Sequence, residues 1–335
     1  MKLGVVFPGG GTRGIISVKL LTELNNRVEK LAFHKGKDFA GIGDKANYLA
    51  GTSIGSLITG AIANGHTPNN IIDIFQKNAG KILKKSSFLP LGKSYYSSEN
   101  LEKILSETMG EKTMGSLDKK ILITSYNLQT SEQTTFTNFG TEDMRHKING
   151  YAWDIDNIKL KDVVQASSAV PGVFKSKEIE YARDNSGIKK YHEVDGTMQN
   201  ISPVMDLVLA MNTLEKVNFK DMFILSVGTG TLNKDAMAYM KDKGVIGHIL
   251  SGQDIAVGHL CAVQDAAENQ AKLLVEGNGG KFFRLEPQVS VDEFCDALDD
   301  SRKQIDKYDK IADEYISMND SYLNEIAEQI VDHYL

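Results

Sequence analysis

The feature of this sequence that most restricts its fold is a series of short apolar runs that alternate with helix-like segments. Residues 3–7 form the first run, and residues 48–50, 120–128 and 221–230 form later ones. Apolar runs of this length predict strands that are buried on both faces of a sheet. Because helical patterns alternate with these strands over most of the chain, we expect an α/β fold with a largely parallel central sheet.

The helix-like segments are those in which apolar residues recur every three or four positions, as they do from residue 15 to residue 28. Further helices are predicted at residues 56–65, 71–83, 160–170 and 291–335, and residues 134–139 are the expected partner of the strand at 120–128. The sequence of residues 86–98 predicts a loop rich in aromatic side chains. This loop is either a lid that meets an acyl chain or a membrane surface, or a segment that packs on its own core.

Composition limits the classes of protein to consider. The 335 residues carry a formal net charge of -6, which does not favour binding to a nucleic acid polymer. The length suits one large core, or one core with a small cap. Two cysteines indicate no disulfide framework, and no stretch approaches the ~20 apolar residues of a membrane span. We therefore expect a cytoplasmic protein, with transient peripheral contact at the inner membrane surface.

The sequence GGGTRG follows the first predicted strand and precedes the first predicted helix. Through Gly9, Gly11 and Gly14 it matches G-x-G-x-x-G, a pattern typical of dinucleotide binding. That interpretation needs an acidic residue about 20 positions later at the end of a strand, whereas Asp38 and Asp44 lie in a loop-like segment. The loop therefore binds either a phosphate or a group that becomes negative during a reaction.

A second motif, AGTSIGS, places Gly51, Ser53 and Gly55 in the spacing G-x-S-x-G. Small residues flank the serine of a nucleophile elbow, because the strand-to-helix turn leaves no room for side chains. The serine hydroxyl then lies at the N-terminus of the next helix, whose dipole favours a developing negative charge. The alternative is that Ser53 caps the helix that starts near Ile54.

Asp195 is the third candidate, in the segment EVDGTMQN, where it follows a strand-like stretch and precedes Gly196. It is either an ordinary turn residue or the base that accepts the proton of Ser53. A desolvated carboxylate can act as a base without a histidine. His248 and His259 occupy ordinary helical positions, so no Ser-Asp-His order emerges.

Together these residues resemble the patatin-like phospholipase family. The family carries G-G-G-x-[KR]-G near its start, then G-x-S-x-G, then A-S-x-x-x-P, here residues 166–171, and finally Asp-Gly-Gly or Asp-Gly-Ala. The four motifs occur here in the family's order, and the resemblance covers roughly residues 3–317. Thr197 stands where the family has glycine or alanine, and residues 200–203 match the family's N-N-P loosely. A threonine there is expected to narrow the pocket or stiffen the turn.

The resemblance implies one patatin-like domain over residues 1–335, a three-layer α/β/α sandwich on which the helices of residues 291–335 pack. It implies a lipid acyl hydrolase that cleaves phospholipid or lysophospholipid esters without a metal or cofactor. Ser53 would be the nucleophile, with Gly51 and Gly55 beside it, and Asp195 the base, with Gly196 supporting its turn. The implied oxyanion hole, called the glycine loop below, consists of Gly9, Gly10, Gly11, Thr12, Arg13 and Gly14.

Three alternatives to a simple hydrolase stay open. One is a nucleotide-sensing protein, and another is a phospholipase effector of antiviral defence that a cyclic nucleotide activates. The third is an inactive relative that binds a partner. Within the glycine loop, Arg13 either holds the loop against the helix or attracts a lipid phosphate.

Overall fold

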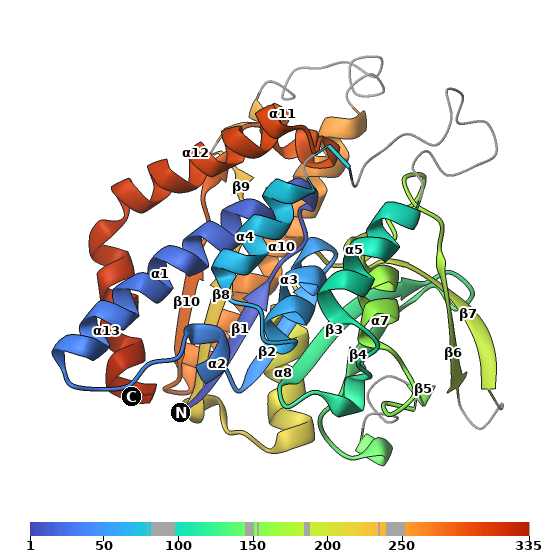
Figure 1. Cartoon of the computed structure of the whole chain (residues 1–335), viewed down its shortest axis with the longest axis horizontal. Helices are drawn as coiled ribbons and strands as arrows, with labels where there is room; N and C mark the ends of the chain where they lie inside the picture. The colour runs from blue at the N-terminus through green and yellow to red at the C-terminus, as the bar shows by residue number, and fades with distance from the viewer. Residues whose placement is uncertain are drawn as a thin grey trace.

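The computed structural model describes residues 1–78, 80–81, 98–144, 151–152, 154–183, 188–233, 235–238 and 252–334. His248 lies outside these residues, and so does the predicted lid at 86–98 apart from its last residue. In the described part, helices cover both faces of one central sheet (Figure 1).

Among the described residues the central sheet has nine strands, in the order β10-β8-β1-β2-β3-β7-β6-β5, with β4 paired to β3 off this path. Neighbouring strands run parallel from β10 (Lys281–Leu285) through β8 (Met222–Val227), β1 (Lys2–Phe7) and β2 (Tyr48–Thr52) to β3 (Lys120–Asn127). The other pairings are antiparallel and involve β4 (Glu132–Thr137), β5 (Tyr151–Ala152), β6 (Lys177–Arg183) and β7 (Ile188–Asp195). A separate parallel pair joins β9 (Thr231–Leu232) and β11 (Gln288–Val289). The predicted α/β class is confirmed, with the parallel pairings on the β10-to-β3 side of the sheet.

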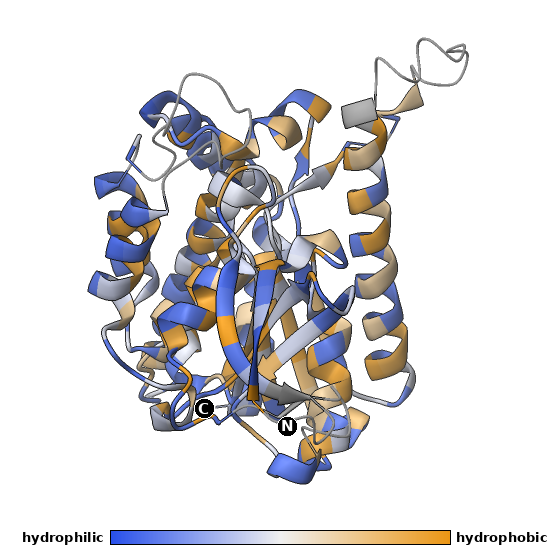
Figure 2. Ribbon diagram, turned by 90° about the vertical axis from the view of Figure 1, so that its right-hand side faces the viewer, coloured by the Kyte–Doolittle hydropathy of each residue, from blue (hydrophilic) through white to orange (hydrophobic). Residues whose placement is uncertain are grey.

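Apolar side chains fill both faces of the parallel strands. In β1 the side chains of Leu3, Val5 and Phe7 belong to one hydrophobic cluster and that of Val6 belongs to the other. Successive side chains of a strand point to opposite faces, so one unbroken apolar run supplies both clusters. Figure 2 shows the same distribution, with hydrophobic residues along the central strands and on the helices around them.

Helices form a layer on each face of the sheet. The first cluster is covered by α1 (Gly14–His34), α3 (Ile54–Ala63), α4 (Pro68–Lys77), α5 (Glu99–Met109), α7 (Leu160–Ser167), α12 (Arg302–Met318) and α13 (Asp320–Tyr334). The second is covered by α8 (Val204–Glu215) and α10 (Gly252–Gly277). Shorter helices are α2 (Ile42–Lys45), α11 (Val291–Cys295), η1 (Gly11–Arg13), η2 (Met114–Ser116), η3 (Gly196–Met198), η4 (Phe219–Asp221) and η6 (Asp296–Leu298). The molecule is therefore a three-layer sandwich.

Some predicted boundaries are wrong for identifiable reasons. The helix predicted at 71–83 begins earlier, at Pro68, because Thr67 forms a capping box and proline suits the first turn. It ends at Lys77. The helix predicted at 160–170 ends at Ser167, since a residue that precedes a proline, here Val170, disfavours helical geometry.

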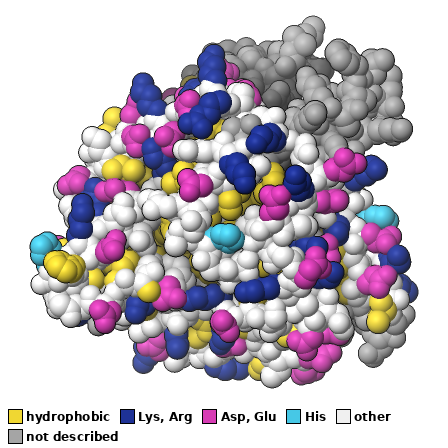
Figure 3. All heavy atoms as spheres, viewed as in Figure 1, with side chains coloured by type: hydrophobic (Ala, Val, Ile, Leu, Met, Phe, Trp, Pro, Cys, Tyr) yellow, Lys and Arg dark blue, Asp and Glu magenta, His cyan; other side chains and the backbone are white. Residues whose placement is uncertain are grey.

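The outer surface is mixed in charge. On the face shown in Figure 3, lysine and arginine side chains are intermingled with aspartate and glutamate side chains. No helix in the described part of the chain combines the length and apolar character that crossing a bilayer requires.

Candidate active site

Ser53 occupies a strained turn between β2 and α3. Its φ of 54° and ψ of -125° are unusual for a residue with a side chain, and such strain is concentrated at functional turns. The turn is tight enough to need its glycines: a Cβ on Gly55 would lie 1.8 Å from the backbone oxygen of Phe7, and one on Gly51 would lie 2.1 Å from that of Gly55. The side chain of Ser53 makes no capping hydrogen bond to α3, so the interpretation of Ser53 as a helix cap is wrong.

Strand register brings Asp195 to this turn. In the sheet, Thr52 pairs with Thr124 of β3, and the next residue of β3, Ser125, pairs with Asp195. Because β7 runs antiparallel to β3, its last residue, Asp195, lies at the level of the sheet where β2 ends. Residues that are 142 positions apart in the sequence thus become neighbours.

Ser53 and Asp195 form a direct hydrogen bond. Ser53 Oγ donates to Asp195 Oδ2 at 2.6 Å, and Ser53 is 6% and Asp195 0% exposed. The other carboxylate oxygen, Oδ1, accepts from the backbone N–H of Thr197 at 2.9 Å and from its hydroxyl at 2.8 Å. Gly196 lets this turn pack on β3, since a Cβ there would lie 2.5 Å from the backbone oxygen of Thr124.

Burial changes the acidity of Asp195. Loss of solvation raises its pKa from 3.8 to about 6, while the hydrogen bonds from Ser53 and Thr197 act in the opposite direction because they stabilise the carboxylate. A pKa near neutrality suits a group that must accept and return a proton. Within the described residues, no histidine hydrogen-bonds to either side chain of the pair.

The glycine loop lies against Ser53. A Cβ on Gly9 would lie 3.3 Å from Ser53 Cβ, and a Cβ on Gly14 would lie 2.5 Å from a side-chain carbon of Ile54. The N–H of Gly9 is already donated to the backbone oxygen of Ile201 at 2.9 Å, and that of Arg13 to Gly10 at 3.2 Å.

The amide of Gly14 also has an acceptor, the backbone oxygen of Gly11. The other three loop amides, those of Gly10, Gly11 and Thr12, have no acceptor among the described residues. Gly11 has a φ of 57°, a conformation that glycine adopts without strain. These three amides are therefore the ones that can bind an anion.

Arg13 is buried inside the protein. Its Nη1 donates to the backbone oxygen of Gly230 at 2.9 Å, and its guanidinium lies 3.7 Å from the ring centre of Phe294. Nearby, the Thr229 hydroxyl donates to the backbone oxygen of Gly9 at 2.7 Å. With Arg13 only 2% exposed, these contacts favour a structural role for it over attraction of a lipid phosphate.

An apolar cavity of about 80 Å³ opens beside Ser53. Ser53 lines it together with Gly11, Thr12 and Ser168. Most of the rest of its wall is apolar and consists of Ile54, Leu57, Phe75, Leu101, Val170, Phe174, Ala297, Leu298 and Ile305, with Asn78 and Asp300 as polar members. The cavity suits a hydrocarbon chain better than a charged ligand.

The last residue of α7 and the segment that follows it hold both members of the pair. Ser167 Oγ accepts from the backbone N–H of Ser53 at 2.9 Å, and the backbone oxygen of Ala169 accepts from the N–H of Asp195 at 3.1 Å. The A-S-x-x-x-P motif marked this segment as a family feature, but nothing in its local pattern indicated these contacts. Thr229 had no sequence signal beyond its position in a glycine turn.

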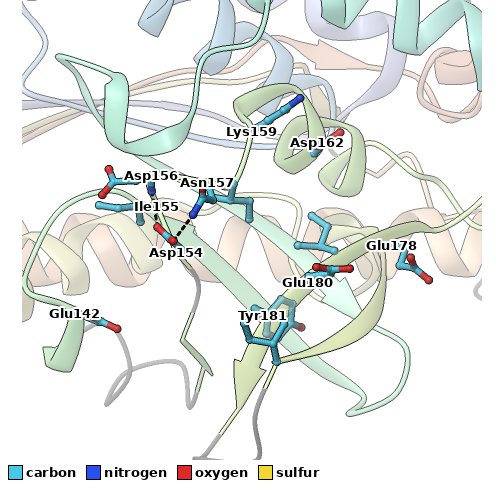
Figure 4. Close-up of a pocket in the computed structure, with 13 residues that line it drawn as sticks. Glu142, Asp154, Ile155, Asp156, Asn157, Lys159, Asp162, Glu178, Glu180 and Tyr181 are labelled. Atoms are coloured by element: carbon cyan, nitrogen blue, oxygen red, sulfur yellow. Dashed lines mark hydrogen bonds between the residues drawn. The ribbon is translucent and has the colours of Figure 1, made fainter.

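A larger pocket, of about 980 Å³, shares no lining residue with the cavity beside Ser53 (Figure 4). Among its described lining residues, carboxylates are the most frequent charged groups: Glu142, Asp154, Asp156, Asp162, Glu178 and Glu180, with Lys159 among them. Several carboxylates have partners, as Asp162 does in its ion pair with Lys177 at 2.6 Å. An acidic wall repels phosphates, so this pocket does not favour a lipid headgroup or a cyclic nucleotide. The described residues also contain no cluster of three or more histidine, cysteine, aspartate or glutamate side chains arranged to hold a metal ion.

A family model for a class of lipid hydrolases, described as patatin-like phospholipase, matches residues 5–208, which is more than half of the chain. The chain therefore belongs to the patatin-like phospholipase family.

Individual relatives are distant. A probable inactive patatin-3-Kuras 1 from Solanum tuberosum is 24% identical over 70% of this chain and 64% of its own length. A cGAMP-activated phospholipase from Vibrio cholerae serotype O1 is 29% identical over 50% of this chain and 47% of its own length. The chain thus spans between about half and two thirds of these relatives. Among solved structures, human GIVD cytosolic phospholipase A2 aligns with 99% of this chain and 63% of that chain, with 11% identity and a TM-score of 0.48.

Proposed function

We propose that this protein is a lipid acyl hydrolase that cleaves carboxylic esters of phospholipids or lysophospholipids through a Ser53–Asp195 dyad. The observation that carries the proposal is the 2.6 Å hydrogen bond from Ser53 Oγ to a buried Asp195 carboxylate, at a strained turn. Membership of the patatin-like phospholipase family supports it.

The reaction follows from the positions of these groups. Ser53 Oγ attacks the ester carbonyl carbon while Asp195 accepts the hydroxyl proton, and the carbonyl oxygen becomes an anion. The amides of Gly10 and Gly11 donate to that anion, and each such donor is worth about 3–4 kcal/mol of barrier. Collapse breaks the bond to the alcohol, which takes the proton from Asp195 and leaves an acyl-enzyme.

Hydrolysis of the acyl-enzyme uses the same residues. Asp195 accepts a proton from water, the hydroxide attacks the acyl carbon, and Ser53 leaves with that proton. The products are a fatty acid and the free enzyme. Because one carboxylate handles both proton transfers, a pKa between that of an ordinary aspartate and neutrality suits it.

The apolar cavity supports an acyl substrate. Its wall includes Leu57, Phe75 and Phe174 as well as Ser53, and each methylene group that enters it gains about 0.8 kcal/mol. The acyl carbonyl can then lie between Ser53 and the glycine loop with its chain in the cavity. A substrate drawn from a bilayer also requires transient contact with the membrane surface.

The test is reaction with a fluorophosphonate, followed by mass spectrometry of the labelled peptide. We expect one label, at Ser53, which is lost in Ser53→Ala and falls at least a hundredfold in rate in Asp195→Asn. Ser131→Ala is the matched control, since Ser131 shares a positive φ of 56° but is exposed. Ester turnover that persists in purified Ser53→Ala protein would refute the proposal.

A second candidate function is a hydrolase of the same chemistry that a cyclic nucleotide activates. Relatives from Vibrio cholerae and from Escherichia coli strain TW11681, 29% and 26% identical, are cGAMP-activated phospholipases. Labelling of Ser53 that rises only when a cyclic nucleotide is added would favour this version. Labelling at full rate without one would exclude it. The simple nucleotide sensor is disfavoured, because a phosphate on the glycine loop would lie beside the carboxylate of Asp195.

A further inference from the structure

Thr197 contacts both halves of the candidate active site. Its hydroxyl donates to Asp195 Oδ1 at 2.8 Å, beside the bond of 2.9 Å from its own backbone N–H. Any residue except proline offers the backbone donor at this position, but only threonine or serine adds an aliphatic hydroxyl so close to the backbone. The glycine or alanine that the patatin-like family carries at this position would leave Oδ1 with one hydrogen-bond donor fewer.

The methyl branch of Thr197 reaches the glycine loop. Its Cγ2 occupies the space above Gly9, where an added Cβ would lie only 2.6 Å away. A β-branched side chain has few accessible χ1 rotamers. The rotamer that directs the hydroxyl to Asp195 therefore also fixes the methyl group on Gly9, and one side chain sets the position of the base relative to the loop.

We propose that Thr197 is a positioning residue, which holds the Asp195 carboxylate toward Ser53 and stabilises its ionised form through the extra hydroxyl donor. This inference rests on the proposed function for its catalytic meaning. Thr197 donates two hydrogen bonds to Oδ1. The other carboxylate oxygen, Oδ2, is therefore the one that points toward Ser53 and accepts a hydrogen bond from its hydroxyl. A donor to a carboxylate favours the charged form, and the Thr197 hydroxyl does lower the pKa of Asp195 against the larger effect of burial.

In the described part of the chain, no other charged group shifts the pKa of Asp195. The neighbouring strand β3 meets it with the uncharged Ser125. On β7, the buried Glu193 accepts from the hydroxyl of Tyr181 at 2.6 Å. From the glycine loop, the guanidinium of Arg13 lies against Phe294. The pKa of Asp195 is therefore governed by burial and by its donors, without a charged partner.

The experiment compares Thr197→Val, which removes the hydroxyl and keeps the shape, with Thr197→Ser, which keeps the hydroxyl and removes the methyl group. Unfolding equilibria are measured at pH 5 and pH 8. We expect Thr197→Val to lower the folding equilibrium constant about tenfold more at pH 8 than at pH 5. The reason is that loss of the hydroxyl donor should raise the pKa of Asp195 by about one unit. Thr197→Ser should keep the pH dependence of the wild-type protein, and Thr197→Ala should behave as Thr197→Val does.

The same substitutions in an Asp195→Asn background supply the control. There the loss caused by Thr197→Val should be equal at the two pH values, because the group that the hydroxyl stabilises no longer ionises. An equal loss at both pH values with Asp195 present would overturn the inference. So would a pH-dependent loss that persists in the Asp195→Asn background.

The pH dependence of Ser53 labelling then tests whether Thr197 also affects catalysis. The pH midpoint of fluorophosphonate labelling at Ser53 should rise by about one unit in Thr197→Val and stay in place in Thr197→Ser. If Ser53 is not labelled in any variant, the proposed function fails, while the unfolding equilibria still decide whether Thr197 stabilises the Asp195 carboxylate. The two failures are therefore distinguishable.

Discussion

Replacing Asp195 by asparagine should abolish the base and at the same time stabilise the folded protein. The carboxylate is fully buried, and its pKa rises from 3.8 to about 6. The folded protein therefore binds the proton more tightly than the unfolded chain does. As a result, wild-type stability rises as pH falls from about 6 toward 3.8, and the destabilisation by the buried charge is fully present above about pH 6. Asparagine keeps the shape and offers Oδ1 to both donors of Thr197, but it carries no charge.

The expected magnitude follows from the shift of about two pKa units. At 1.36 kcal/mol per unit, Asp195→Asn should be more stable than wild type by about 3 kcal/mol at pH 8, and by about half of that at pH 5. For a chain of this size the gain at pH 8 corresponds to about 4 °C in Tm. Thermal unfolding of both proteins at the two pH values measures it, with Asp118→Asn, an exposed aspartate, as the control. An Asp195→Asn protein no more stable than wild type at pH 8 would refute the reasoning.

Two further predictions concern the base and the elbow. Because Asp195 must be ionised to accept a proton, the rate of fluorophosphonate labelling at Ser53 should fall about tenfold per pH unit below pH 6; a rate that is flat from pH 8 to pH 5 would mean that another group is the base. Gly55→Ala places a Cβ 1.8 Å from the backbone oxygen of Phe7, so β1 and α3 must separate, and we expect loss of at least 3 kcal/mol or of soluble protein. Gly277→Ala, whose Cβ would meet nothing within 4 Å, is the control and should leave Tm unchanged.

Local patterns in the sequence were sufficient for most elements of the fold. The apolar run at residues 3–7 corresponds to β1, and the segment at 221–230 contains β8, because a strand buried on both faces needs no polar alternation. The repeat of apolar residues every three or four positions, which begins at residue 15, corresponds to α1. Helix ends were predicted less well, since they depend on capping side chains such as that of Thr67 and on the residue before a proline.

The elbow could also be predicted locally, because the glycines that make room for Ser53 are its sequence neighbours. Its partners could not be derived from local pattern. Asp195 was one turn aspartate among many until the family motif singled it out, and the role of Thr197 was expected only as narrowing or stiffening. Ser167 carried no indication that it accepts from the backbone of Ser53.

The sequence by itself determined the order of strands and helices and the tight turn that presents Ser53, since both arise from residues close together in the chain. Only the tertiary structure decided that Asp195 reaches Ser53 and that Arg13 is buried against Phe294. It also decided that the amides of Gly10 and Gly11 have no acceptor among the described residues. The physical reason is strand register. Thr52 pairs with β3 at the level where antiparallel β7 ends, and a pairing between segments so distant in sequence leaves no periodic trace in either of them.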